Sequence, residues 1–295
     1  MLCKEILQGA VEIHAHSAPD TFPRLFDHVE FAKQARDYGF KGVVIKSQTM
    51  GSADRVPFIK QLVPGIDIFG GLVLNYAVGG LNPFAVEAAI GFGARIVWMP
   101  TGDAMNHISF FAKSAGINPL SRSSDQPAFR RLAKGISVLD DKGSLVPEVL
   151  DILDLVAKAD ICLSLGHLTI QEMEVLGCEA LRRGIKKIVV DHPNLFFTKM
   201  PIDKQKEMVR RGIKMVYCFI EFSPNYFSIT PREMAANVKA LGAENAVLAT
   251  DGGQISNTAP AEAMRIMVEL MMENGLQQQE IETMIKRNPS ELIYP

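Results

Sequence analysis

Short apolar runs recur along the chain, and each is followed by a polar or glycine-rich stretch. Most of these runs are continuous rather than alternating, which is typical of parallel strands covered on both faces. They predict eight β-strands, at Val11–His16, Gly42–Ser47, Ile66–Leu74, Arg95–Met99, Ile161–Gly166, Lys187–Asp191, Ile213–Ile220 and Ala246–Thr250.

Helical patterns lie between these runs, and a glycine closes several of them just before the next strand. The expected helices are Asp27–Tyr38, Pro83–Phe92, Val146–Ala159, Ile170–Arg183, Ile202–Arg211 and Thr230–Leu241. Alternating strands and helices predict a parallel α/β fold, and eight such units in 295 residues favour a closed (β/α)8 TIM barrel. An open doubly wound sheet is the alternative. No Gly-x-Gly-x-x-Gly follows the first strand, which argues against a dinucleotide-binding fold.

The pattern indicates a single domain over residues 1–295, with one long insertion at about 101–145, after the fourth strand. Residues 135–146 predict a hairpin turned at Asp-Lys-Gly. Because long loops between barrel elements are often active-site lids, we expect residues 101–135 to cover the barrel mouth. Residues 260–295 predict two extra C-terminal helices, separated at Asn274-Gly275.

Composition excludes several classes of protein. The chain is 47% hydrophobic and 22% charged, as expected of a globular domain, and its net charge of −2 gives no basic surface for nucleic acid. No apolar run approaches the length of a membrane span, and the N-terminus lacks the apolar region of a signal peptide. The four cysteines are scattered, which indicates reduced thiols and a cytoplasmic protein. Homo-oligomer formation is left open.

The first predicted strand ends in a His-x-His pair, His14 and His16, with Glu12 one step below. Residues i and i+2 of a strand point to the same side, so both imidazoles aim in one direction. Neutral imidazoles are good ligands for a divalent metal such as zinc.

Two further histidines end predicted strands, His167 on the fifth and His192 on the sixth. The eighth strand runs apolar until Asp251, which precedes Gly252-Gly253. Active sites of TIM barrels lie at the C-terminal ends of the strands, and the eighth strand closes against the first. We therefore expect Asp251 to face the His-x-His pair, where a carboxylate can both bind a metal and accept a proton from water.

This arrangement resembles the amidohydrolase superfamily of metal-dependent hydrolases, and more narrowly an amidohydrolase-related group with no assigned reaction. The ending Asn288-Pro289-Ser290 is also similar to the close of several members. The resemblance implies a metal-activated water that attacks an amide, ester, lactone or phosphoester bond of a small molecule. It implies a centre of zinc, or of manganese or iron, with five ligands: His14, His16, His167, His192 and Asp251.

One position departs from that family. Two-metal members carry a bridging lysine or glutamate at the end of strand four, and this chain has neither there. We therefore favour one metal per chain, with two kept open. Lys46, which ends the second strand, is a candidate to bind an anionic substrate or to bridge two metals as a carbamate.

Other polar residues fall on loops expected at the same face. Arg24 is a candidate clamp for a carboxylate or phosphate, His107 could close over the site from the insertion, and Glu221 could line the mouth. His28 opens the first helix and is expected at the surface.

Two other functions remain as alternatives. One is a catalytically inactive barrel that keeps its metal and binds a ligand or a partner. The other is a phosphoesterase of the polymerase-and-histidinol-phosphatase type, which also opens with His-x-His. That type ends its barrel with Asp-x-His, whereas this chain has Asp251-Gly252-Gly253.

Overall fold

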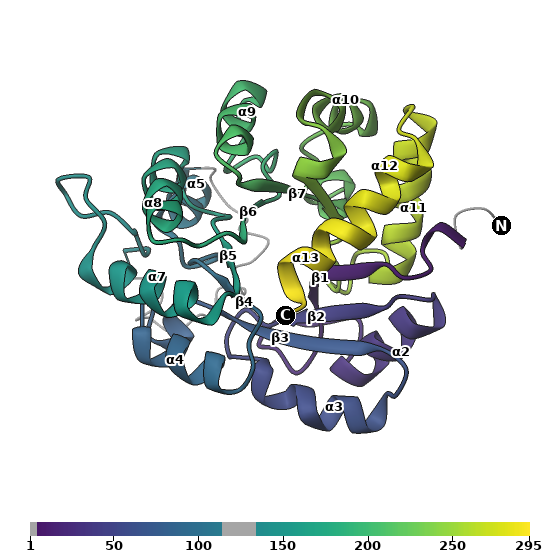
Figure 1. Cartoon of the computed structure of the whole chain (residues 1–295), viewed down its shortest axis with the longest axis horizontal. Helices are drawn as coiled ribbons and strands as arrows, with labels where there is room; N and C mark the ends of the chain where they lie inside the picture. The colour runs from purple at the N-terminus through teal and green to yellow at the C-terminus, as the bar shows by residue number, and fades with distance from the viewer. Residues whose placement is uncertain (1–4, 114–133) are drawn as a thin grey trace.

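The computed structural model describes residues 5–113 and 134–295, and its centre is one sheet of parallel strands taken in sequence order (Figure 1). Each strand pairs with the next in parallel register from β1 to β8. The strands are β1 (Val11–His16), β2 (Gly42–Lys46), β3 (Asp67–Val73), β4 (Ile96–Trp98), β5 (Cys162–Ser164), β6 (Ile188–Asp191), β7 (Lys214–Cys218) and β8 (Ala246–Ala249).

The sheet closes on itself where the end of β8 meets the end of β1. Ala15 forms a parallel bridge with Gly252. The Asp251 amide donates to the His14 carbonyl (2.7 Å), and the His16 amide donates to the Gly252 carbonyl (2.8 Å). The predicted (β/α)8 barrel is therefore confirmed, and all eight C-terminal strand ends lie at one face.

Helices surround the strands, as Figure 1 shows. Between strands lie α2 (His28–Asp37), α3 (Val56–Leu62), α4 (Pro83–Gly91), α5 (Met105–Lys113), α7 (Pro147–Ala159), α8 (Ile170–Arg182), α9 (Ile202–Arg210) and α10 (Pro231–Leu241). Three of them begin with a capping box, at Asp27, Thr169 and Thr230, in which a glutamate three residues later returns the hydrogen bond. α3 was not among the expected helices, since its short sequence carries little helical periodicity.

Two strands end two residues earlier than their apolar runs predict, so those boundaries were wrong. β5 ends at Ser164, and the chain then turns so that His167 adopts a positive φ of 68°. β7 ends at Cys218, because residues 219–222 form a 3₁₀ turn. In that turn the Glu221 carboxylate accepts the Cys218 amide (2.9 Å), which diverts the chain from the sheet.

The insertion after β4 begins with α5, which lies at the C-terminal face. The side-chain amide of Asn106 donates to the carbonyls of His167 (3.1 Å), Leu168 (3.2 Å) and Phe197 (3.1 Å), so it holds α5 against the loops after β5 and β6. The expected hairpin forms, with Leu139 paired antiparallel to Leu145. Of the described insertion, α5 thus lies at the face where a lid was predicted. Residues 114–133 lie outside the described residues.

The C-terminal segment forms α11 (Pro260–Glu273), α12 (Gln278–Glu282), a π-helical turn at Thr283–Arg287 and α13 (Asn288–Ile293). The expected break at Asn274-Gly275 is present, and Gly275 has a φ of 83°. The fully buried Asn288 donates to the carbonyls of Ala243 (2.8 Å) and Ala246 (2.6 Å), at the start of β8. This Asn-Pro motif therefore fixes the C-terminal helix to the barrel, on the side opposite the strand ends.

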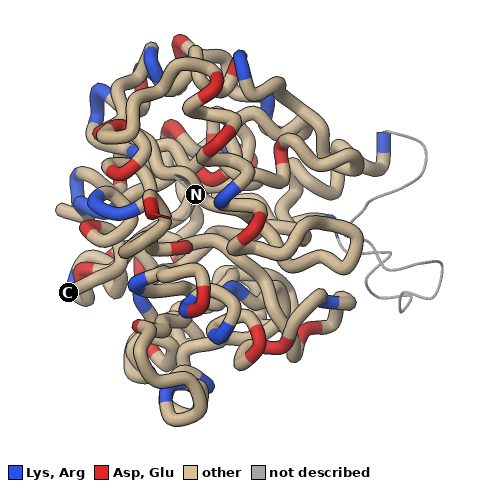
Figure 2. Tube along the Cα trace, turned by 90° about the vertical axis from the view of Figure 1, so that its right-hand side faces the viewer, with Lys and Arg blue, Asp and Glu red and all other residues tan. Residues whose placement is uncertain are grey.

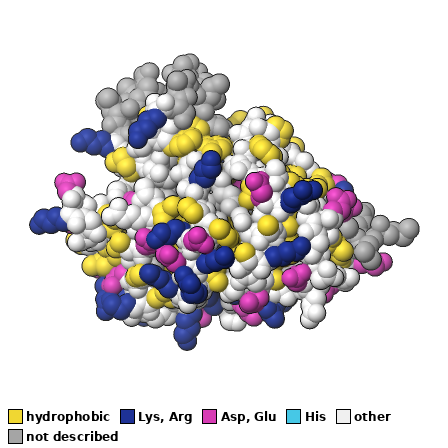
Figure 3. Space-filling view, turned by 90° about the horizontal axis from the view of Figure 1, so that it is seen from above, with side chains coloured by type: hydrophobic (Ala, Val, Ile, Leu, Met, Phe, Trp, Pro, Cys, Tyr) yellow, Lys and Arg dark blue, Asp and Glu magenta, His cyan; other side chains and the backbone are white. Residues whose placement is uncertain are grey.

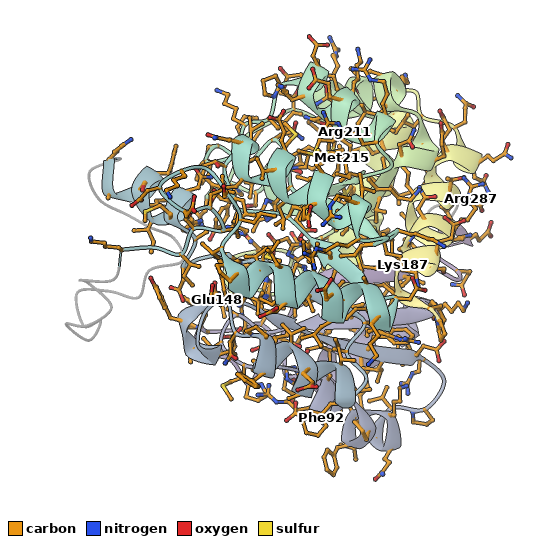
Figure 4. All side chains as sticks on the ribbon, turned by 60° about the vertical axis from the view of Figure 1, so that its left-hand side comes forward. Phe92, Glu148, Lys187, Arg211, Met215 and Arg287 are labelled. Carbon is orange, nitrogen blue, oxygen red and sulfur yellow. The ribbon has the colours of Figure 1, made fainter. Side chains whose placement is uncertain are left out.

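Positions of charged residues of both signs are distributed over the outer helices and loops (Figure 2), and their side chains are interspersed on the face in Figure 3. From the side of α7 and α8, Glu148, Arg211 and Arg287 lie on the outside of the molecule (Figure 4). None of the helices in residues 5–113 and 134–295 is long and apolar enough to cross a membrane.

Candidate metal centre

The ends of β1, β6 and β8 bring three ligand side chains to one point. One ligand atom each from His14, His192 and Asp251 lies within 4.8 Å of the other two, and all three residues are buried. His192 and Asp251 have positive φ angles of 35° and 47°. These left-handed turns directly after the strands point the two side chains into the barrel mouth.

The carboxylate of Asp251 is the centre of the cluster. Its Oδ1 lies 3.0 Å from His16 Nε2 and 3.3 Å from His14 Nε2, and its Oδ2 lies 3.9 Å from His192 Nε2. Burial alone would raise the pKa of Asp251, but the charge and hydrogen bond of His14, and then the contact with His16, hold it well below its usual range. The carboxylate is therefore ionised at neutral pH.

The contact between His16 and Asp251 has a chemical requirement. Each ring nitrogen of His16 faces an oxygen that can only accept: Nδ1 lies 3.1 Å from the Lys46 carbonyl, and Nε2 lies 3.0 Å from Asp251 Oδ1. Burial and then the charge of Arg24 lower the pKa of His16 to about 3, so the ring is neutral and carries one proton. One of the two contacts therefore brings a bare nitrogen against an oxygen lone pair. Two lone pairs at that distance need a cation between them.

His14 lies between two carboxylates. Its Nδ1 is 3.2 Å from Asp191 Oδ1, and its Nε2 is 3.3 Å from Asp251 Oδ1. Burial and Lys46 oppose protonation, but the two carboxylates outweigh them and raise the pKa of His14 to about 9. A carboxylate behind a ligand histidine is the usual way in which proteins fix its tautomer and raise its basicity.

His192 has both ring nitrogens buried without a hydrogen-bond partner among the described residues. Burial lowers the pKa of His192 to about 4, so it is a neutral imidazole at physiological pH. Buried polar atoms are normally paired, because an unpaired one costs about 1–3 kcal/mol. A metal ion bound to this ring would remove that cost.

These residues fit a divalent metal ion. With metal–ligand bonds of about 2.0–2.2 Å, ligand atoms on one ion lie roughly 3.0–3.5 Å apart. The distances from Asp251 Oδ1 to His16 and His14, 3.0 and 3.3 Å, lie in that range. His14, His192 and Asp251 supply two imidazole nitrogens and a carboxylate oxygen that converge, and His16 adds a third imidazole against the same carboxylate. This donor set is suited to zinc, manganese or iron.

The fifth predicted ligand, His167, lies beside this cluster. Its ring centroid is 4.7 Å from that of His192, in an edge-to-face arrangement. Its Nδ1 is 3.2 Å from Nδ1 of His107, which α5 brings to the site. The structure thus brings His107 to the cluster, as the sequence predicts, but its contact is with His167.

Lys46 is buried, with 1% of its surface exposed, at the end of β2. Its Nζ is 2.7 Å from His14 Nε2 and 5.1 Å from the centre of the Trp98 ring. Burial lowers the pKa of Lys46. At 2.7 Å only one of the two nitrogens can donate, so Lys46 and His14 are not both charged.

The other candidates differ in where they lie. Arg24 lines a pocket beside the cluster. Glu221 is fully buried, and both of its oxygens accept backbone amides, from Asn194 (3.0 Å) and Cys218 (2.9 Å), so it shapes the strand ends and does not line the mouth. His28 is 4% exposed and bonds Ser17 Oγ (2.7 Å), so the expectation of a surface histidine was wrong.

Three residues near the centre were missed by the sequence analysis. Asp191 ends β6 next to His192, and an acidic residue closing an apolar run was a signal that could have identified it. Gln48 and Tyr226 lie in loops after β2 and β7 and line the same pocket as Arg24. No spacing in the sequence marks either of them.

Several solved structures share this fold. A phosphotriesterase homology protein from Escherichia coli, with phosphate in its active site, aligns with a TM-score of 0.57 and 14% identity over 96% of this chain and 98% of its own. An organophosphorus hydrolase from Deinococcus radiodurans aligns with a TM-score of 0.60 and 14% identity over 98% and 93%. An amidohydrolase from Pseudomonas aeruginosa aligns with a TM-score of 0.59 and 11% identity over 99% of both.

These alignments show that the chain has the fold that phosphotriesterase-like and amidohydrolase proteins share. No curated protein sequence matches the chain. One family of sequences does match, over residues 9–216, a range that includes His14, His16, His167 and His192 and stops before Asp251. The chain therefore belongs to the family described as "Family of unknown function (DUF6282)".

Proposed function

We propose that this protein is a metal-dependent hydrolase that uses a metal-activated water on an amide, ester, lactone or phosphoester bond of a small molecule. The observation that carries the proposal is the contact between His16 and Asp251, in which a neutral imidazole with acceptors at both nitrogens lies 3.0 Å from an ionised carboxylate. The unpartnered His192 ring supports it independently. The hydrolases named among the similar structures have the same fold and are consistent with this chemistry.

The proposed metal ligands are His14, His16, His192 and Asp251, with His167 beside them. A divalent cation held there supplies Lewis acidity, which makes water acidic enough to ionise near neutral pH. The missing carboxylate at strand four favours one ion per chain. Zinc suits the imidazole-rich donor set best, and manganese or iron fits the same ligands.

Asp251 has a second role in this proposal, as the group that accepts a proton from the attacking water. It is ionised, and it is the carboxylate in contact with His14, His16 and His192 at the mouth. Asp191 is also ionised and buried, but it lies behind His14 and receives a hydrogen bond from Ser164. Asp191 therefore positions His14, while Asp251 faces the substrate side.

Two lateral groups complete the site. The Lys46 amine lies against a ligand nitrogen, so we propose that it contacts the group bound at the metal rather than the outer part of a substrate. His107 packs between His167 and the aromatic rings of Phe111 and Phe197, with ring centroids 4.8–5.2 Å apart. It thereby closes the α5 side of the mouth.

The test is elemental analysis of the purified protein, followed by turnover of a panel of lactones, esters, amides and phosphoesters. We expect about one transition metal per chain and turnover of at least one substrate class. Turnover should be lost with chelator and restored when the metal is added back, which controls for damage by the chelator.

The outcomes separate the three functions considered. Metal without turnover of any substrate would favour the inactive, ligand-binding barrel. Turnover confined to phosphomonoesters would favour the phosphoesterase alternative. A protein that holds no transition metal at all, even after exposure to excess zinc, would overturn the proposal.

A further inference from the structure

A narrow pocket opens beside the candidate metal centre, between the loops that follow β1, β2, β6 and β7. His16, His167 and Asp251 form its inner wall. Leu195, Phe197 and Ile220 form an apolar wall, and Arg24, Gln48, Tyr226 and Gln254 supply polar groups. Gln254 already donates to the Asp251 carbonyl and accepts from the Asn257 side chain, so a group that enters this pocket meets Arg24, Gln48 and Tyr226.

In the part of the chain that the structure describes, the guanidinium group of Arg24 forms hydrogen bonds along one of its edges only. Its side chain is 2% exposed, and its Nε (3.1 Å) and Nη2 (2.8 Å) both donate to Asp20 Oδ2. Asp20 is itself fixed, because its Oδ1 accepts the Thr21 amide at 2.6 Å. Within the described residues, Nη1 of Arg24 has no partner, although an arginine normally uses its donors when buried.

Gln48 also presents a donor without a partner, and a backbone amide determines its orientation. The Thr101 amide donates to Asn75 Oδ1 (2.9 Å), so Asn75 Nδ2 is the donor to Thr101 Oγ1 (2.9 Å). That hydroxyl must then donate its own proton to Gln48 Oε1, at 2.6 Å. The Gln48 amide nitrogen is left on the opposite side, with no partner in the described part of the chain.

Tyr226 supplies the third group. The residue is 6% exposed, and its ring is stacked on Phe196, with 6.3 Å between centroids and 8° between planes. Its hydroxyl has no hydrogen-bond partner among residues 5–113 and 134–295. Burial, and then the charge of Asp251, raises the pKa of Tyr226, so the hydroxyl keeps its proton and can donate.

We propose that the substrate carries an oxyanion, a carboxylate or a phosphate, which binds Arg24, Gln48 and Tyr226 next to the bond that is cleaved. Each of the three groups offers a donor, and one of them is a guanidinium cation that is paired with Asp20 along its other edge. The complement of several convergent donors and a buried cation is an anionic oxygen group, because charge-assisted hydrogen bonds to it are shorter and stronger than those to neutral acceptors. That this pocket binds an anion is argued from the pocket alone. That the anion belongs to a substrate rests on the proposed hydrolase function.

The test measures binding, so that it does not depend on turnover. Inorganic phosphate and succinate are titrated separately into the metal-loaded protein by calorimetry, for the wild type and the variants. Tyr226→Phe keeps the ring and removes an unpaired hydroxyl, so it disturbs no existing contact. We expect it to weaken the binding of one or both anions about tenfold, the scale of one hydrogen bond to a charged group.

Arg24→Gln should weaken binding further, and its matched control is Arg36→Gln. Arg36 is exposed and pairs with the exposed Asp37, so this control should bind like the wild type. Preference for succinate or for phosphate identifies the oxyanion. The inference is overturned if neither anion binds the wild type, or if Tyr226→Phe and Arg24→Gln bind as tightly as the wild type because the metal alone holds the anion.

A second measurement separates this inference from the proposed function. Two esters are compared that differ only in a carboxylate near the scissile bond, replaced in one by a neutral amide. If neither is hydrolysed but the variants lose anion binding, the anion site stands and the hydrolase proposal loses support. Equal turnover of both esters, unchanged in Tyr226→Phe, contradicts the anion site and supports the hydrolase.

Discussion

Metal binding should displace one proton from the protein, and that proton comes from His14. The carboxylates of Asp191 and Asp251 raise the pKa of His14 to about 9 against the opposing effect of burial. Burial lowers the pKa of His16 to about 3 and that of His192 to about 4, so those two rings are already neutral between pH 6 and 7. Among the predicted ligands in the cluster, His14 alone must lose a proton before it can bind metal.

The sign and size of the effect follow from linkage. The competing proton is bound below pH 9, so the apparent metal affinity must rise with pH, by about tenfold per unit up to that value. At pH 7, two pH units below the pKa of about 9, the proton on His14 reduces the apparent metal affinity roughly 100-fold, which corresponds to about 2.7 kcal/mol of binding free energy. The assay is zinc binding at pH 6 and pH 7 in competition with a chromophoric chelator of known pH dependence.

Calorimetry in two buffers of different ionisation enthalpy counts the protons released, and we expect about one per metal at pH 6–7. Asp191→Asn removes the largest charge that raises the pKa of His14, so proton release and the pH slope should both become smaller. Asp37→Asn, an exposed carboxylate far from the centre, is the matched control. A metal affinity that is the same at pH 6 and pH 7 in the wild type would refute this account of the site.

Three further predictions concern the ligands and the residue beneath them. Replacing His14 and His16 together by alanine should remove the metal with an unchanged circular dichroism spectrum, whereas full metal retention would contradict the assignment. Asp251→Asn should keep much of its metal and lose roughly 10²-fold in kcat, the scale of a lost general base; near-normal turnover would move that role elsewhere. Burial raises the pKa of Glu12 to about 7, so the wild type should lose stability as the pH rises from about 4.5 to 7. Glu12→Gln should lack this loss. Between pH 5 and pH 8, its free energy of unfolding, measured by urea denaturation, should rise by roughly 2–3 kcal/mol relative to that of the wild type. Parallel pH profiles of the two proteins would argue against this account.

The barrel and the core of the candidate site could be predicted from the sequence because both depend on local periodicity. Continuous apolar runs that alternate with helical patterns predict parallel strands, and parallel strands bring their C-terminal ends to one face. His14, His16, His192 and Asp251 each lie at or directly after such an end, so their convergence followed from strand order alone.

Contacts between loops were decided by the tertiary structure. Glu221 was expected at the mouth, but a 3₁₀ turn directs its carboxylate to two backbone amides. His28 was expected at the surface and is buried by contacts with Ser17 and Arg55, the latter at 3.2 Å. Gln48 and Tyr226 lie on loops whose path no periodic pattern describes.

The sequence by itself determined which residues carry the candidate chemistry and on which strands they lie. Only the tertiary structure decided their charge states, since these depend on burial and on neighbours distant in sequence. His14 and His16 are two residues apart on one strand, yet the pKa of one is raised to about 9 and that of the other is lowered to about 3. The difference arises because Asp191 from β6 lies against His14, while the charge of Arg24 acts on His16.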